Sequence, residues 1–281
     1  MAFAAALLCA LAASLNAFAA PQHVVSVNIC TDEYVYRLLP PQRIAALSFL
    51  AADRHPVIST IVDKVKGIAL IHPSAETVIA LHPDLVVAYQ GVNPNLHALL
   101  ARAGVKVLDV PYADSLDDIR QTTRMLGDAL GEPARANALL ARMHRELAAA
   151  HAATNVPTVI YEPNGYATSN AVGDAIMADA GLRDVAPRLH RTRLGDIPLE
   201  TLIASPPALL ILNDANEASP ARAEMLLKSP VLAAIEGHTT VAHLSLVPLL
   251  CPGPWSADAA APLARLGKEI SSKLARPHHQ S

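Results

Sequence analysis

One pattern occurs twice in this chain, first from residue 76 and again from residue 200. Both copies have Glu, Thr, Ile, Ala and Pro at the same offsets, and a leucine follows two positions after the proline. Because proline disfavours helix at the residue before it, each copy predicts a short helix that begins near the Glu and ends before the Pro. The apolar runs that follow, 85–88 and 209–212, predict strands buried on both faces.

The segments around the two copies also correspond. Residues 99–104 and 232–237 each predict a helix that ends at a glycine, the expected C-cap, with a strand directly after it. A strand is also predicted at the start of each half, over 24–27 and over 158–161. Alternating strands and helices predict parallel sheets, so the predicted fold class is α/β with two similar parallel-sheet lobes.

A helical region separates the two halves. Ser115 and Asp118 have the spacing of a capping box and start a predicted helix that runs to about Leu130. A Gly-Glu-Pro sequence breaks it, and apolar residues at helical spacing then predict a long helix that connects the lobes, which at ~1.5 Å per residue can run about 30 Å. The predicted domains are an N-terminal lobe over 20–130, a connecting helix within 131–155, a C-terminal lobe over 156–276 and a tail over 277–281.

The first 19 residues predict a secretory signal peptide. They are apolar, contain no Lys or Arg, and end in Ala17-Phe18-Ala19, which has the A-x-A form of a cleavage site. A membrane anchor is the alternative interpretation, since about 20 apolar residues span a bilayer, but the small-residue end favours cleavage. We therefore expect the mature protein in the periplasm.

The charge pattern argues against nucleic acid as a partner. The chain has a net charge of -3, and its 22 Lys and Arg residues are scattered without a basic run. Hydrophobic residues make up 52% of the sequence, which favours a folded chain, and we expect a monomer.

The loops that follow the predicted strands carry much of the aromatic content of a chain that is only 4% aromatic. In open parallel sheets ligands bind beyond the carboxyl ends of the strands, and two facing lobes would share a cleft there. Aromatic walls favour a large planar or amphipathic ligand, although each ring has the alternative role of filling a lobe core. Tyr166 and Trp255 lie in turn-rich segments and are expected to be exposed in the cleft. The predicted ligand-binding residues are Cys30, Phe49, Tyr89, Gln90, Tyr166 and Trp255.

Two cysteines remain after removal of the signal peptide, and both fall in predicted cleft loops. An oxidising compartment permits a disulfide between Cys30 and Cys251 that would tether the lobes. Coordination of the ligand's metal and two free thiols are the other interpretations, because pairing cannot be deduced from such a spacing.

The sequence predicts no catalytic site. It contains neither a G-x-S-x-G elbow nor a G-x-G-x-x-G loop. Asp32 and Glu33 have no catalytic spacing and are expected to be solvated loop charges. The 12 histidines are dispersed, so no protein-held metal and no resident cofactor are predicted, and a chelated metal is the expected ligand. The alternative function is a chelatase-like or other tetrapyrrole-handling enzyme on a related two-lobed fold.

The sequence resembles the substrate-binding proteins of ABC importers for iron complexes and cobalamin. The resemblance rests on residues 43–48, 76–87, 103–107, 159–166, 198–202 and 229–235. It implies a class III periplasmic-binding-protein fold, with two lobes on one long helix, and a cleft that captures a ferric siderophore, haem or cobalamin.

The resemblance also implies a partner and two contact residues. The partner is the ABC permease dimer in the inner membrane, and Glu76 and Glu200 would each dock onto permease arginines, one from each lobe. Each Glu also lies where it would stabilise the positive end of a helix dipole, and the two roles are compatible.

Overall fold

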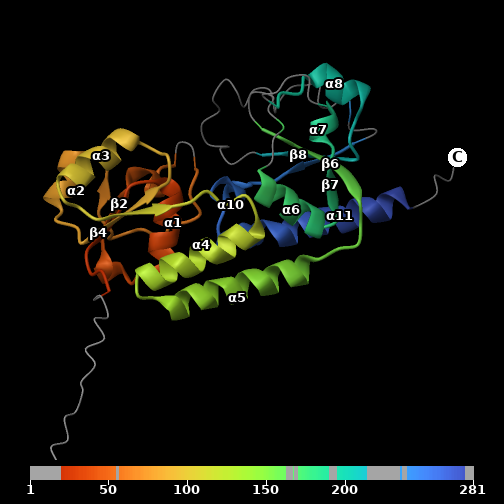
Figure 1. Ribbon diagram of the computed structural model, residues 1–281. Helices are drawn as coiled ribbons and strands as arrows, with labels where there is room; N and C mark the ends of the chain where they lie inside the picture. The colour runs from red at the N-terminus through yellow and green to blue at the C-terminus, as the bar shows by residue number, and fades with distance from the viewer. Residues whose placement is uncertain are drawn as a thin grey trace, which may run out of the picture.

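The computed structural model describes residues 20–54, 57–162, 167, 170–189, 195–213, 235 and 239–275. These residues form two parallel sheets, one in each half of the chain, joined by a pair of long helices (Figure 1). The predicted signal peptide and the tail from 277 lie outside the described residues, as does Tyr166. No helix in the described ranges is both long enough and apolar enough to cross a membrane.

The first sheet has the strand order β3-β2-β1-β4-β5, with every pairing parallel. Its strands are β1 (Val24–Ser26), β2 (Ile44–Ser48), β3 (Leu70–Ile71), β4 (Leu85–Tyr89) and β5 (Val107–Val110). The helical elements of this half are α1 (Ile29–Leu38), η1 (Pro41–Arg43), η2 (Phe49–Ala52), α2 (Ala75–Ala80) and α3 (Pro94–Arg102).

The second sheet has the order β7-β6-β8-β9 and is also parallel throughout. Its strands are β6 (Val156–Tyr161), β7 (Leu182–Asp184), β8 (Leu209–Leu212) and β9 (Thr240–His243). The helical elements of this half are α6 (Ala171–Asp179), α7 (Ala186–Leu189), α8 (Leu199–Ala204), α10 (Val247–Leu250), η5 (Pro254–Ala259) and α11 (Ala260–Leu274).

The internal repeat has the same place in both sheets. Helix α2 precedes β4, which pairs with the opening strand β1, and helix α8 precedes β8, which pairs with the opening strand β6. Both strands are apolar and almost fully buried, as expected for strands covered on both faces. The prediction of two similar α/β lobes is therefore confirmed.

Two antiparallel helices, α4 (Leu116–Ala129) and α5 (Pro133–Ala150), connect the lobes along one side of the molecule (Figure 1). Ser115 caps α4 as expected, because its hydroxyl oxygen accepts a hydrogen bond from the backbone N–H of Asp118 at 3.0 Å. The connection was expected to be a single helix. In the structure α4 contributes to it as well, since Ile119 is buried in the core of the second lobe and Leu126 in the core of the first.

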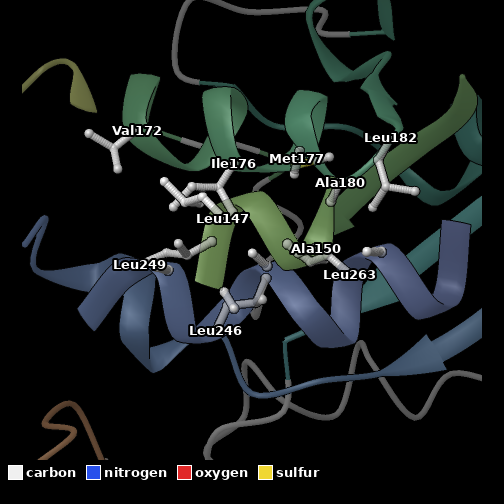
Figure 2. Close-up of a cluster of buried hydrophobic side chains, with 14 of the residues drawn as sticks. Leu147, Ala150, Val172, Ile176, Met177, Ala180, Leu182, Leu246, Leu249 and Leu263 are labelled. Carbon is white, nitrogen blue, oxygen red and sulfur yellow. The ribbon is translucent and has the colours of Figure 1, made fainter. Parts of the chain in front are cut away.

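The core of the second lobe surrounds the C-terminal half of α5. Leu147 and Ala150 pack there against Ile176 of α6 and Leu263 of α11 (Figure 2). At its other end α5 packs into the first lobe through Ala136. One helix is therefore part of both hydrophobic cores.

The chain makes a further crossing after β9. We name residues 251–259 the return segment, because this stretch leaves the second lobe, enters the core of the first lobe and then continues into α11. Its Trp255 is 2% exposed and packs edge-on against Tyr34 of α1, with the ring centroids 4.7 Å apart. The expectation that Trp255 is exposed in the cleft is wrong, because α1 offers it an apolar contact and a guanidinium, that of Arg37, 4.6 Å from its ring centroid.

Candidate ligand-binding site

The carboxyl ends of the first sheet carry two pairs of rings. Phe49 follows β2 and stacks on His72, which follows β3, with centroids 4.0 Å apart and planes inclined by 27°. Tyr89 ends β4 and meets Tyr112, just beyond β5, edge-on at 6.1 Å. We name these four residues the aromatic edge. The strand order places one pair on each side of β1, so the pairs flank the start of α1.

The register of the strands explains why these rings meet. Leu47 pairs with Leu70 and Ser48 with Ile71, so the next residue of each strand, Phe49 and His72, continues the same ladder. Side chains at paired positions of neighbouring strands lie close enough for rings to touch.

Tyr89 is a neutral phenol at physiological pH. Burial, helped by the neighbouring Tyr112 and Asp114, raises its pKa to about 12. Its hydroxyl therefore keeps its proton and is available as a hydrogen-bond donor to a ligand. Gln90, the next residue, is exposed.

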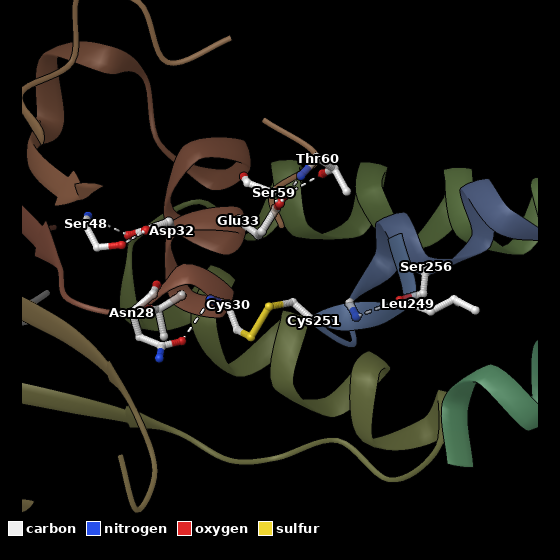
Figure 3. The surroundings of a disulfide bond; sticks show 12 residues. Asn28, Cys30, Asp32, Glu33, Ser48, Ser59, Thr60, Leu249, Cys251 and Ser256 are labelled. Atoms are coloured by element: carbon white, nitrogen blue, oxygen red, sulfur yellow. Dashed lines mark hydrogen bonds between the residues drawn. A yellow bond between two sulfur atoms is a disulfide. The ribbon is translucent and has the colours of Figure 1, made fainter. Parts of the chain in front are cut away.

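The first turn of α1 lies between the two ring pairs. Asn28 caps this helix, since its side-chain oxygen accepts from the backbone N–H of Cys30 at 2.8 Å. Cys30 is bonded to Cys251 of the return segment (Figure 3). Of the three interpretations of these cysteines, the structure has the disulfide, which leaves neither thiol free to coordinate a metal.

Asp32 and Glu33 are fully buried, so the expectation of solvated loop charges is wrong for both. Asp32 accepts hydrogen bonds from the backbone N–H of Ser48, at 3.1 Å, and from the Ser48 hydroxyl. Glu33 pairs with Arg37 and accepts from the backbone N–H of Thr60 at 2.6 Å. The first turn of α1 is thereby fixed to the strand end that precedes Phe49.

The second lobe has a polar network at the corresponding strand ends. The amide of Asn213, after β8, donates to both carboxylate oxygens of Glu162, after β6, at 2.9 and 2.7 Å. The Asn213 oxygen accepts from the backbone N–H of Leu246 at 2.9 Å. Burial raises the pKa of Glu162, while the hydrogen bond from Asn213 lowers it by a smaller amount. This network joins the ends of β6 and β8 to the segment that leads into α10.

Of the predicted ligand residues, Phe49, Tyr89 and Gln90 lie at the carboxyl ends of the first sheet. Cys30 lies beside them in a disulfide, Trp255 is in the core, and Tyr166 is outside the described residues. His72 and Tyr112 were not predicted. Tyr112 could have been found from its position just after a predicted strand. His72 could not, because β3 has only 2 residues and gives no recognisable strand pattern.

Glu76 and Glu200 are exposed in the first turns of α2 and α8. The two helices belong to different lobes, and in Figure 1 both lie at edges of the molecule far from α5. Each of these two equivalent helices therefore presents an exposed carboxylate.

A groove of about 540 Å³ lies elsewhere, among α4, α5 and α6. Its polar lining includes Arg120, His144 and the His151–Asp179 pair, whose Nδ1 and Oδ1 atoms are 2.8 Å apart. It is formed by the connecting helices and does not include the aromatic edge. Within the described ranges, no three His, Cys, Asp or Glu side chains gather closely enough to hold a metal ion.

Two α/β lobes, each with a parallel sheet and joined by connecting helices, are the architecture of a class III periplasmic binding protein. A family model described as "Periplasmic binding protein" matches residues 24–240, so the chain belongs to this family. Because this family consists of binding proteins, the prediction that the chain is a binding protein and not an enzyme is confirmed.

Solved structures have the same architecture. The periplasmic haem-binding protein RhuT from Roseiflexus sp. RS-1 is 24% identical with a TM-score of 0.69, over 89% of this chain and 99% of that one. A periplasmic haem-binding protein from Pseudomonas aeruginosa is 26% identical with a TM-score of 0.62, over 88% of this chain and 92% of that one.

A curated relative comes from Bacillus subtilis (strain 168), where it is described as an uncharacterized ABC transporter substrate-binding lipoprotein, YvrC. It is 28% identical over 130 residues, or 45% of this chain. The match spans 40% of the relative, less than half of its length.

Proposed function

We propose that this protein is the substrate-binding component of an ABC importer and that it captures a metal chelate with a large, flat or amphipathic organic scaffold. Haem, a cobalamin and a ferric siderophore are the candidate ligands. The observation that carries the proposal is the aromatic edge: two ring pairs at the strand ends where ligands of such folds bind.

The chemistry of these side chains suits a chelate better than a bare ion. Rings offer broad apolar contact and stacking to an organic scaffold, while the scaffold itself supplies most of the metal's ligands. The neutral Tyr89 and the exposed Gln90 add hydrogen bonds at the rim of such a ligand. The haem-binding function stated for the P. aeruginosa relative supports haem as the first candidate.

The proposed partner is an ABC permease dimer. Glu76 and Glu200 would each contact arginines of one permease subunit, since each lobe presents one exposed carboxylate from an equivalent helix. The protein would act outside the cytoplasm. Both a free periplasmic form and an anchored form remain within the proposal, because the B. subtilis relative is described as a lipoprotein.

Ligand titrations test the proposal directly. The mature chain is titrated with ferric protoporphyrin IX, cyanocobalamin and a ferric hydroxamate siderophore, and binding is followed by calorimetry and by the absorbance of each chelate. We expect saturable 1:1 or 2:1 binding of one of the three. If none binds, the chelate part of the proposal is wrong.

Two substitutions locate the binding site. Phe49→Ala removes one stacking surface and should weaken the bound chelate about tenfold, the size expected for losing one aromatic contact and its buried area. Tyr36→Phe changes a ring of α1 outside the aromatic edge and serves as the matched control. Equal affinities of Phe49→Ala and the wild type would place the ligand elsewhere.

A further inference from the structure

The return segment is a further connection between the two lobes, and it packs beside the connecting helix α5. Cys251 lies directly after α10, which belongs to the second lobe, and both Cys251 and Trp255 are buried in the core of the first lobe. The disulfide to Cys30 closes this junction covalently across a sequence separation of 221 residues (Figure 3).

Several non-covalent contacts hold the same segment. Trp255 packs against Tyr34 and lies under the guanidinium of Arg37, which is itself paired with the buried Glu33. Further along, Arg142 of α5 pairs with Asp258. The segment therefore contacts α1 on one side and the connecting helix α5 on the other.

The path of the segment permits little adjustment. A Cβ atom at Gly253 would lie 2.3 Å from the ring of Trp255, so the indole is folded back over its own turn. The backbone N–H of Gly253 donates to the Ser256 hydroxyl at 3.1 Å, and that hydroxyl donates to the carbonyl of Pro248 at 3.0 Å. Residues 248–256 thus form one compact turn that contains both Cys251 and Trp255.

These contacts restrict how the lobes can separate. A hinge in α4 and α5 alone would leave the return segment bridging the gap, and the lobes could part only if Trp255 left its core and the disulfide broke. Non-covalent packing opens locally on its own, but a covalent bond opens only by chemistry.

We propose that the disulfide and the return segment form a redox-controlled latch between the lobes, which a thiol–disulfide reductant opens. The ligand part of this inference rests on the proposed function: an open latch should speed the exchange of the bound chelate. The bond lies in the first turn of α1, between the two ring pairs of the aromatic edge, so its opening loosens the ligand-facing side of the junction.

The chemical step is an exchange with a dithiol. A thiolate of the dithiol attacks one sulfur of the disulfide, the S–S bond breaks, and a mixed disulfide forms. The second thiol of the reductant then displaces the protein sulfur. Two electrons and two protons pass to the protein, which gains two thiols, and the reductant becomes a disulfide. We assign the attacked sulfur to Cys30, because this residue is the more exposed of the two, whereas Cys251 is 3% exposed.

The latch is tested first without any ligand. Amide hydrogen exchange of the mature chain is measured by mass spectrometry before and after treatment with dithiothreitol, and the Cys30→Ser/Cys251→Ser double variant is treated in the same way. We expect the amide exchange rates of residues 247–259 and of α1 to rise at least about tenfold on reduction, because the loss of the covalent bond makes local opening easier. The double variant should match the reduced wild type and not respond to the dithiol. Unchanged exchange on reduction would overturn the latch.

The second arm measures release of ferric protoporphyrin IX in stopped flow. Release from the reduced protein should be several times faster than from the oxidised protein, and Trp255→Phe, which keeps the bond, should stay dithiol-sensitive. Equal release rates in both redox states would overturn the coupling to ligand exchange. If the wild type binds no porphyrin, the release measurement uses whichever of the other two chelates binds, and the hydrogen-exchange measurement decides the latch independently of the ligand. Reduction of the native protein also decides it if the double variant does not fold.

Discussion

Asp32 is a carboxyl group that the fold buries completely and that accepts hydrogen bonds from Ser48. Its pKa is raised to about 7 in all, and burial is the largest cause. The hydrogen bonds from Ser26 and Ser48 lower the pKa by less than burial raises it, and the nearby Glu33 raises it slightly. The folded chain therefore binds a proton here at a pH where the unfolded chain, with a pKa near 3.8, has already lost it.

This difference predicts a pH dependence of stability. Between about pH 4 and pH 7 the folded state holds more protons than the unfolded state, so the contribution of Asp32 to the free energy of unfolding falls as the pH rises. Asp32→Asn removes the titration and keeps one acceptor oxygen for Ser48. Relative to this variant, the free energy of unfolding of the wild type should fall by about 2–3 kcal/mol between pH 5 and pH 8. The conversion is about 1.4 kcal/mol per unit of pKa difference.

Urea unfolding at pH 5, 6, 7 and 8 measures the effect. Asp128→Asn, a change at an exposed position of α4, is the matched control and should follow the wild type at every pH. Stability profiles that stay parallel for the wild type and Asp32→Asn would contradict the assigned pKa.

Single residues were the hardest features to predict. The strand that opens the chain was predicted, but the sequence does not show that α1 begins as early as Ile29, and this start turns Asp32 and Glu33 toward β2 and the loop at Thr60. Trp255 was misplaced for a related reason: its Gly- and Pro-rich surroundings are typical of an exposed turn, while its burial depends on a contact with Tyr34, far away in the sequence.

At the scale of elements, the repeat was informative because it combines two local signals. The Pro that ends the helix and the buried apolar strand that follows depend only on neighbouring residues, so α2, β4, α8 and β8 were all predicted. The crossing of α4 between the lobes was not predicted, since its burial pattern depends on which lobe core each turn reaches.

Helices α2 and α8 carry the docking prediction. The Glu76→Ala/Glu200→Ala variant should bind its chelate with unchanged affinity, because both carboxylates are exposed and outside the aromatic edge. It should deliver that chelate to its permease at least about tenfold more slowly, since charges at the rim of an interface mainly set the rate of association.

Uptake of the labelled chelate into proteoliposomes that contain the permease measures the delivery step. Glu269→Ala/Asp128→Ala removes two exposed carboxylates away from α2 and α8 and serves as the control for net charge. Normal uptake by the double variant would refute the docking role and leave the two glutamates as stabilisers of their helix dipoles.

At the scale of the whole molecule, the lobes depend on one another. Helices α4 and α5 contribute to both cores, and the return segment places residues that follow the second sheet into the first core. Neither core is complete without a segment from the other half of the chain. We therefore expect the mature protein to unfold in one cooperative transition, although it has two sheets.

Gly127 allows the close contact of α4 and α5 on which this unity depends. A Cβ atom at position 127 would lie 2.4 Å from the Cβ of Ala136, which is closer than two non-bonded carbon atoms can approach. Gly127→Ala must therefore push α4 away from α5. Overpacking of this kind costs typically about 1–3 kcal/mol. Because the two helices belong to both cores, the Tm of the single transition should fall, and no separate transition should appear for either lobe.

Calorimetry of the oxidised protein measures this Tm. Arg124→Ala on the exposed face of α4 is the control and is expected to melt close to the wild type. A variant that melts in two steps would show that the lobes fold as independent units, and it would also mean that the latch holds together two domains that are each stable alone.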